Sequence, residues 1–171
     1  QFGHAVTIDG NTAVVGASGS NANVTTTASG SAIVFRRIGG SWQEVQRLTA
    51  SDAATNDFFG FSVSLDGSAL LITAPGDNTG ATIDHGSAYI FVFNGTTWLQ
   101  TQKLLANDGA LDDAFGLRYG ALDLPYAIIG ARTHDHSVSD AGAAYVYFFN
   151  GITWTQTQEL RAFDRMATDT F

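Results

Sequence analysis

The chain has no cysteine, only two prolines and only eight basic residues against sixteen acidic ones. Without cysteine it forms neither disulfides nor thiolate metal sites. A net charge of -8 opposes binding to phosphate backbones and anionic bilayers, which require a field of Lys and Arg. The sequence also lacks the roughly 20 consecutive apolar residues that span a bilayer. We therefore expect neither a nucleic-acid partner nor membrane insertion.

The sequence is organised as an internal repeat. A Phe-Gly pair and a tryptophan recur at intervals of 56 or 57 residues. The repeated residues are Phe2-Gly3, Phe59-Gly60, Phe115-Gly116, Trp42, Trp98 and Trp154, and Phe171 falls at the phase of the other phenylalanines. A fixed period of this length predicts units that stack on their neighbours to bury a continuous core. We expect one structural domain made of three repeats, 1–58, 59–114 and 115–171.

Each repeat is predicted to contain four strands. Alternating or β-branched apolar runs are separated by Asp-Gly, Asn-Gly or Gly-Gly turns, and no helical period is present. The expected strands are 4–8, 12–17, 31–37 and 42–48, then 62–65, 69–74, 87–93 and 98–104, then 117–122, 126–131, 143–149 and 154–160. The first turn of the third repeat, Asp123-Leu124-Pro125, must differ, because proline fixes φ and lacks an N–H.

This pattern predicts an all-β fold, a β-propeller with three four-stranded antiparallel blades; a solenoid or a sandwich is the lesser alternative. The phenylalanines and tryptophans are expected to pack within and between blades, although a repeated tryptophan could also stack on sugars. Known closed propellers have four to eight blades. We therefore expect either an excised part of a larger propeller or head-to-tail association, in which two copies give six blades.

The repeated segments resemble the FG-GAP repeats of integrin α-subunit propellers and of many bacterial extracellular proteins. The Phe-Gly pairs match the first element of that repeat. The segments that resemble the second element are Gly16-Ala17, Thr73-Ala74-Pro75 and Gly130-Ala131. The resemblance covers the whole chain and is closest to a bacterial subtype. It implies an extracellular or cell-surface propeller used in adhesion or ligand binding, and it implies no catalytic activity.

One feature of the resembled family is missing. Its calcium-binding members carry a loop rich in Asp and Asn between the two elements, since Ca²⁺ takes six to eight oxygen ligands. Here that space holds only short turns, which are Asp9-Gly10-Asn11, Asp66-Gly67-Ser68 and Asp123-Leu124-Pro125. One carboxylate on such a turn cannot surround a calcium ion, so no cofactor is expected.

Pairs of aspartates precede each Phe-Gly element at constant spacing. The pairs are Asp52 and Asp57, Asp108 and Asp113, and Asp164 and Asp169. A short carboxylate in a loop usually accepts hydrogen bonds from nearby backbone N–H groups, and this capping role is the favoured interpretation. The same six residues are the weaker candidates for a metal site.

The repeats diverge most in the loop after the second strand, at 18–30, 76–84 and 132–141. A variable loop on a faithful scaffold is the natural place for recognition. The candidate ligand-binding residues there are Asp77, Asn78, Asp84, His85, His134, Asp135, His136 and Asp140. His134, Asp135 and His136 are also plausible zinc or copper ligands, although such loop histidines are usually solvated.

The sequence contains no Cys nucleophile, no Gly-x-Ser-x-Gly elbow and no His-Glu-x-x-His motif, so an enzyme is not expected. The preferred hypothesis is a non-enzymatic extracellular adhesion module that recognises a protein or surface partner through its divergent loops. The alternative is a lectin-like propeller that binds glycans between its blades.

Overall fold

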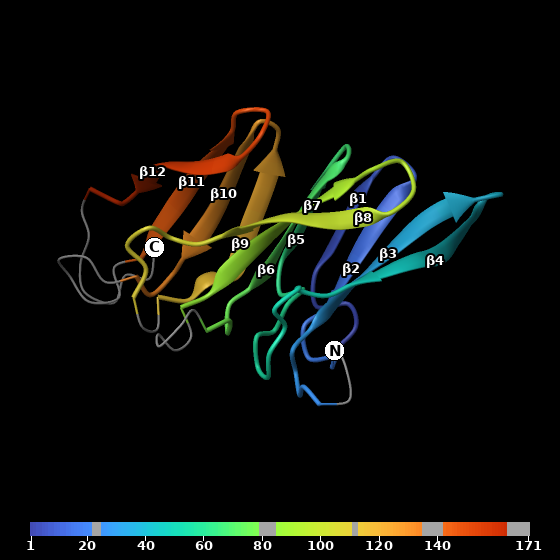
Figure 1. Ribbon diagram of the computed structural model, residues 1–171, viewed down its shortest axis with the longest axis horizontal. Coiled ribbons are helices and arrows are strands. Elements are labelled where there is room, and N and C mark those ends of the chain that lie inside the picture. The colour runs from blue at the N-terminus through green and yellow to red at the C-terminus, as the bar shows by residue number, and fades with distance from the viewer. Residues whose placement is uncertain (22–24, 79–84, 111–112, 135–141, 164–171) are drawn as a thin grey trace.

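The computed structural model describes residues 1–21, 25–78, 85–110, 113–134 and 142–163 (Figure 1). The described residues form twelve strands: β1 (Val6–Asp9), β2 (Thr12–Ala17), β3 (Ser31–Ile38), β4 (Ser41–Leu48), β5 (Val63–Asp66), β6 (Ala69–Ala74), β7 (Ser87–Phe93), β8 (Trp98–Leu104), β9 (Phe115–Asp123), β10 (Tyr126–Ala131), β11 (Ala143–Phe149) and β12 (Trp154–Leu160). None of the described segments is a helix long and apolar enough to cross a bilayer.

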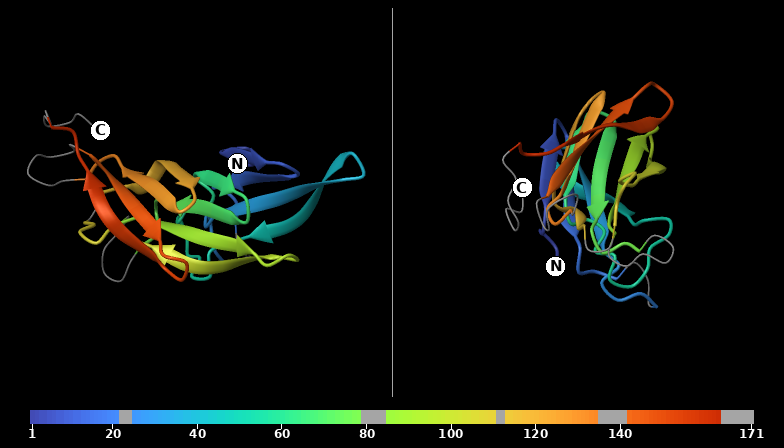
Figure 2. Two further views of the ribbon diagram at one scale, coloured as in Figure 1. Left: turned by 90° about the horizontal axis from the view of Figure 1, so that it is seen from above. Right: turned by 90° about the vertical axis from the view of Figure 1, so that its left-hand side faces the viewer.

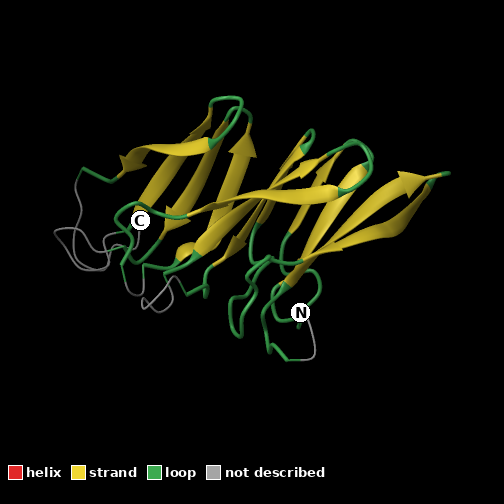
Figure 3. Ribbon diagram, viewed as in Figure 1, coloured by secondary structure: helices red, strands yellow, loops and turns green. Residues whose placement is uncertain are grey.

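The strands form three four-stranded antiparallel sheets, each from strands consecutive in the sequence (Figure 3). The sheets are β1-β2-β3-β4, β5-β6-β7-β8 and β9-β10-β11-β12. The prediction of an all-β fold built from four-stranded blades is confirmed, and we call the sheets blades 1, 2 and 3. Blade 1 and blade 3 lie at opposite ends of the molecule with blade 2 between them (Figure 2).

The strand boundaries differ from the predicted ones by a few residues. Strand β1 begins at Val6 and not at residue 4, because the N–H groups of Gly3 and His4 both donate to the carbonyl of Gly16 and interrupt the ladder. Strand β9 is longer than predicted and already begins at Phe115. Its hairpin with β10 closes through a cis Leu124–Pro125 peptide bond, so the predicted difference in this turn is confirmed.

The first strands of the three blades lie side by side, and side chains of one blade bind the backbone of the next. Asp9 accepts a hydrogen bond from the Gly67 N–H at 2.8 Å, one blade further along the chain. Asp66 accepts one from the Leu124 N–H at 2.7 Å. The aspartates of the predicted hairpin turns therefore also join the blades.

The fourth strands are joined by a repeated amide clamp. The side chain of Gln46 accepts from the backbone N–H of Trp98 and donates to its carbonyl, both at 2.8 Å. Gln102 makes the same two bonds with Trp154, at 2.8 and 2.7 Å. The backbone N–H and carbonyl of the tryptophan that begins β8 or β12 are therefore both hydrogen-bonded to the glutamine of the preceding blade.

The apolar core lies between blades and not within them. One cluster joins Val14 and Val34 of blade 1 to Phe59 and Trp98 of blade 2, and a second cluster joins blade 2 to blade 3. Phe59 is 0% exposed, whereas its counterpart Phe2 in blade 1 is 65% exposed. The predicted packing of these aromatic side chains between blades is confirmed, and a blade without a preceding neighbour leaves them uncovered.

The glycines of the second and third Phe-Gly pairs, Gly60 and Gly116, permit close approach of two blades. Gly60 has φ of +88°, and a Cβ atom there would lie 2.3 Å from the carbonyl oxygen of Ser31 in blade 1. Gly3 has nearly the same φ, +87°, but nothing lies within 4 Å of its Cβ position. Both positions need a left-handed backbone, but only Gly60 is also confined by a neighbouring blade.

We predict that Gly60→Ala lowers the free energy of unfolding by about 1–3 kcal/mol more than Gly3→Ala does, because only Gly60→Ala forces two blades apart. Chemical denaturation of both variants measures this difference. The two positions share the same backbone strain, so Gly3→Ala is the matched control. Equal destabilisation by the two substitutions would show that backbone conformation, and not blade contact, requires the glycine.

Candidate functional site

The divergent loops and the aspartate-containing linkers lie at one edge of the blades. In an antiparallel blade the second strand ends, the third begins and the fourth ends on the same side. The described part of the first divergent loop contacts the following linker, since Asn56 donates its N–H to Thr27 O at 2.9 Å and Phe58 to Ala28 O at 3.1 Å. We call this edge the loop face, which is the lower edge in Figure 1.

The second aspartate of each described pair caps its own linker. Asp57 accepts a hydrogen bond from the Ala54 N–H at 2.5 Å, and Asp113 accepts one from the Ala110 N–H at 2.6 Å. Both side chains are buried. The capping role predicted for the pairs therefore holds for Asp57 and Asp113, whereas Asp52 and Asp108 point into polar clusters beneath the loop face.

The junction of blades 1 and 2 contains a closed polar cluster, which we call the blade 2 cluster: Asp52, Asp77, Tyr89 and Lys103. The Lys103 ammonium lies 2.6 Å from Asp52 Oδ2 and 2.5 Å from Asp77 Oδ2. The Tyr89 hydroxyl donates to Asp52 at 2.9 Å and is 3.1 Å from Asp77 Oδ2. Two carboxylates are thus bridged by one ammonium group and one phenol.

These contacts shift the ionisation of the cluster. Burial alone would raise the pKa of Asp52, but hydrogen bonds from Lys103 and Tyr89 outweigh it and lower the pKa. Burial alone would lower the pKa of Lys103, but its bonds to Asp52 and Asp77 raise it. Burial raises the pKa of Tyr89 far beyond its usual range, which keeps the phenol protonated. The cluster is therefore an ion pair at neutral pH.

The junction of blades 2 and 3 holds different residues at the same positions, which we call the blade 3 cluster. His134 replaces Asp77, Glu159 replaces Lys103, and Asp108 and Tyr145 are the counterparts of Asp52 and Tyr89. Arg161 lies just after β12 and makes two hydrogen bonds to the Glu159 carboxylate. The central position thus changes from a cation to an anion.

His134 is held by a buried carboxylate. Its Nδ1 lies 2.9 Å from Asp113 Oδ2, and both side chains are almost inaccessible to solvent. Its Nε2 lies 3.7 Å from Asp108 Oδ2 and 3.6 Å from Glu159 Oε1. Burial, followed by the neighbouring Asp108 carboxylate, raises the pKa of Tyr145, so this phenol also stays neutral.

Asp108, His134 and Glu159 each offer one ligand atom, and these three atoms lie within 4.8 Å of one another. Among the described residues this is the group whose spacing suits a metal ion. The group unites one predicted metal candidate, Asp108, with one predicted ligand-binding residue, His134. It adds Glu159, which lies in a regular strand outside both predicted sets.

The other sequence-predicted residues are dispersed. Asp77, His85 and His134 are buried beneath the loop face, with 3%, 8% and 3% of their surface exposed. Asn78 is exposed on that face. The candidates outside the described residues are Asp84, Asp135, His136, Asp140, Asp164 and Asp169. His85 and His134 thus lie beneath the loops and are not exposed to solvent.

Sequence reasoning missed Lys103, Glu159, Tyr89, Tyr145 and Arg161, because all but the last lie in strands that were interpreted as scaffold. A signal was nevertheless present. The residue before the final leucine of the fourth strand is Arg47, Lys103 or Glu159 in the three repeats. When the charge at one position of an otherwise regular repeat changes sign, the side chains that surround this position are expected to differ as well.

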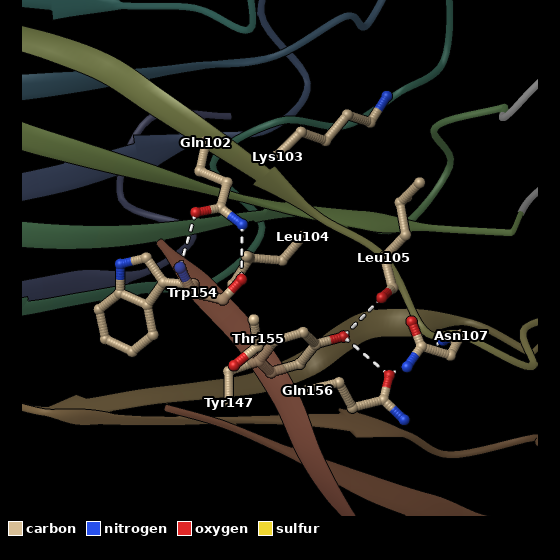
Figure 4. A pocket seen from close by; sticks show the side chains of 9 residues that line it. All are labelled: Gln102, Lys103, Leu104, Leu105, Asn107, Tyr147, Trp154, Thr155 and Gln156. Atoms are coloured by element: carbon tan, nitrogen blue, oxygen red, sulfur yellow. Dashed lines mark hydrogen bonds between the residues drawn. The ribbon is translucent and has the colours of Figure 1, made fainter. Parts of the chain in front are cut away.

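A pocket of about 370 Å³ lies between blades 2 and 3 on the outer strands (Figure 4). It is lined by Gln102, Lys103, Leu104, Leu105, Asn107, Tyr147, Trp154, Thr155 and Gln156. Most of its polar groups are already engaged, since Gln102 clamps Trp154 and the Tyr147 hydroxyl donates to Leu105 O at 2.7 Å. Trp154 is only 5% exposed and offers no open ring face.

Four-stranded antiparallel blades with a repeated Phe-Gly contact between them are typical of a propeller-type binding module. The FG-GAP repeat model matches residues 1–35, 42–91 and 98–147, so the chain belongs to the FG-GAP repeat family. A comparison with curated proteins gives no match.

We predict that Lys103→Met lowers the free energy of unfolding at pH 7 by about 1–3 kcal/mol, because it leaves two neighbouring carboxylates without their cation in a partly exposed site. The exposed Arg37→Met is the matched control and is expected to change stability by less than about 0.5 kcal/mol. Urea denaturation at several pH values measures both effects.

The pH dependence follows from the shifts. Since the folded pKa of Asp52 is lowered, its stabilising contribution is present at neutral pH and is lost as the pH falls below the ordinary aspartate value of 3.8. Since that of Lys103 is raised, its contribution is lost only as the pH rises above 10.5. The deficit of Lys103→Met should therefore shrink in acid. A deficit of the same size at pH 3 and pH 7 would rule out the ion pair as its cause.

Proposed function

We propose that the chain is a non-enzymatic extracellular or cell-surface module that binds a protein or surface partner through the loop face. The observation that carries this proposal is the contrast between the two edges of the blades. Four of the six hairpin turns at one edge are Asp-Gly or Asn-Gly, whereas the loops at the other edge differ in every repeat. Variable loops on a rigid repeated scaffold are the usual form of a recognition surface.

The buried clusters support this proposal. Asp77 and His134 each hold their divergent loop at its first turn, because their N–H groups donate to the carbonyls of Ala74 and Ala131. Their own carbonyls accept from Gly86 and Gly142 at 3.1 Å, where the chain returns to the next strand. The bases of these loops are fixed, so less ordering of the loop is required when a partner binds.

The lectin-like alternative has weaker support. The pocket between blades 2 and 3 has aromatic and amide side chains of the kind that bind sugars, but Trp154 and Tyr147 are buried. The amide of Gln102 is already bound to backbone groups. A glycan would have to break contacts between blades to reach an aromatic ring face, which disfavours this function.

We predict that introducing positive charge on the loop face reduces binding at least tenfold, whereas the same change at the hairpin turns does not. Thr25→Arg with Asn78→Arg alters exposed loop-face positions, and Thr96→Arg with Thr153→Arg is the control at the opposite edge. The probes are a panel of immobilised extracellular matrix proteins and a glycan array. Equal effects at both edges would contradict the proposal, and glycan binding alone would support the lectin-like alternative.

The ends of the molecule suggest a second partner surface. Phe2, Val6, Ile8 and Trp42 are exposed on the open side of blade 1, while their counterparts in blade 2 are buried against blade 1. On the open side of blade 3, Ile128 is exposed, while its counterpart Leu71 is buried against blade 3. Two apolar hollows lie beside Ile128. Each end thus presents one half of an interface that occurs twice inside the chain.

We propose that a second copy of the 171-residue chain, bound head to tail, covers these end faces. Blade 1 of the second copy presents the surface that blade 3 of the first requires. Two copies supply six blades, within the range of closed propellers. We predict that light scattering gives a mass above 18.1 kDa, and that Val6→Glu with Ile8→Glu restores the monomer. Thr96→Glu with Thr153→Glu is the control. A monomer at all concentrations would contradict this association.

A further inference from the structure

The blade 3 cluster contains a buried imidazole nitrogen that faces two carboxylates. His134 is 3% exposed, and its Nε2 has no hydrogen-bond partner among the described residues. Oxygens of Asp108 and Glu159 lie 3.7 and 3.6 Å from it. These distances are beyond a good hydrogen bond, and an ionised carboxylate has no proton to donate.

The buried contact on the opposite side of the ring selects the tautomer. Asp113 Oδ2 accepts a hydrogen bond from the Ala110 N–H and lies 2.9 Å from His134 Nδ1. In a neutral imidazole the proton therefore lies on Nδ1, and the lone pair of Nε2 points toward Asp108 and Glu159. A carboxylate behind a histidine is the usual support for a metal-ligating ring, because it fixes the ring orientation and raises its basicity.

The spacing of the ligand atoms fits a small tetrahedral ion. Ligands about 2.0–2.2 Å from Zn²⁺ at tetrahedral angles lie about 3.4 Å apart. The two measured separations from Nε2 are 3.6 and 3.7 Å, and all three ligand atoms lie within 4.8 Å. One imidazole with two carboxylates suits Zn²⁺ and related first-row ions, whereas Ca²⁺ prefers oxygen ligands alone.

Comparison with blade 2 shows what fills the same place there. In blade 2 the Lys103 ammonium lies between the two carboxylates, 2.6 Å from Asp52 Oδ2 and 2.5 Å from Asp77 Oδ2. In blade 3 this lysine is replaced by Glu159, and the cationic side chain comes from Arg161. Arg161 binds Glu159 and lies 3.9 Å from Asp108, and about a quarter of its side chain is exposed. It can therefore move into solvent without crossing the core.

We propose that Asp108, His134 and Glu159 bind one Zn²⁺ ion at the junction of blades 2 and 3, with Asp113 as the residue that orients His134. The ion takes the place that the Lys103 ammonium holds in blade 2. It joins the linker after β8 to the loop after β10 and to strand β12. Three protein ligands leave one coordination position for water or for a group of a binding partner.

Calorimetric titration of the untagged, chelator-treated chain with ZnCl₂ tests the proposal. We expect one equivalent of Zn²⁺ to bind and to raise the melting temperature. His134→Gln and Glu159→Gln should each weaken binding at least tenfold. His4→Gln is the control, since His4 is an exposed histidine of blade 1, outside the blade 3 cluster. It should leave the affinity unchanged.

Exchanging residues between the two clusters distinguishes a loss of Zn²⁺ binding from a loss of folding. His134→Asp combined with Glu159→Lys copies the blade 2 cluster into blade 3, so the protein should fold and lose Zn²⁺ binding. Asp77→His combined with Lys103→Glu copies the blade 3 cluster into blade 2, where Asp57 takes the place of Asp113. This variant should bind two Zn²⁺ ions per chain and not one. Circular dichroism confirms folding in each case.

Co²⁺ serves as a spectroscopic probe of the same site, because its visible absorption is intense in tetrahedral coordination. We expect that absorption in the unaltered chain and its loss in His134→Gln. An absence of Zn²⁺ binding, or binding that survives both His134→Gln and Glu159→Gln, would overturn the proposal. In that case the three carboxylates around His134 form a polar cluster that needs no metal.

Discussion

The contact between successive blades is the constraint on which the rest of the structure depends. Among the described residues, the two apolar clusters lie between neighbouring sheets, because large apolar side chains of blade 1 are covered by blade 2 and those of blade 2 by blade 3. The close approach at Gly60 allows the backbone of one blade to rest against Ser31 of the blade before it. The turn aspartates and the amide clamps satisfy the polar groups that this approach buries. Binding surfaces are therefore carried by a scaffold whose spacing is fixed by backbone contact.

Each blade junction also encloses a polar cluster beneath the loop face, and the two described clusters solve the same electrostatic problem differently. At the blade 2 cluster, the carboxylates of the buried Asp77 and the more exposed Asp52 are neutralised by Lys103 from strand β8. At the blade 3 cluster the strand supplies Glu159, so the cation must come from elsewhere. Burial makes an uncompensated carboxylate costly, and Asp113 and Asp57 are almost fully buried. The residue at the Lys103 or Glu159 position and the residue at the Asp77 or His134 position therefore have to change together.

Much of the fold could be predicted from the sequence, because it depends on local and periodic signals. The Phe-Gly and tryptophan period fixes the repeat, alternating apolar residues fix the strands, and Asp-Gly or Pro-containing segments fix the turns. The exact start of β1 could not be predicted, since it depends on the shared carbonyl of Gly16. The capping role of Asp57 and Asp113 could be predicted, because an aspartate that caps its own loop needs no distant partner.

The candidate site was less predictable, because its members come from different blades. Asp108 belongs to the linker after blade 2, while His134 and Glu159 belong to blade 3. No sequence spacing within one repeat brings them together. Sequence reasoning placed His134 in a solvated recognition loop, but the turn that begins at Ala131 directs it inward against Asp113. The residue that completes the group, Glu159, lies in a regular strand whose pattern indicates only scaffold.

In the proposed function, the same arrangement links the divergent residues beneath the loops to recognition above them. The residues that replace one another at the junctions, Asp77 and His134, are also the residues whose backbone groups hold the first turn of each divergent loop. A change in the buried charge therefore acts on the base of a surface loop without altering the contacts between the blades. Because those contacts are repeated and rigid, the difference is confined to the loop face. The scaffold can thus keep one geometry while each junction sets the chemistry and the position of its own loop.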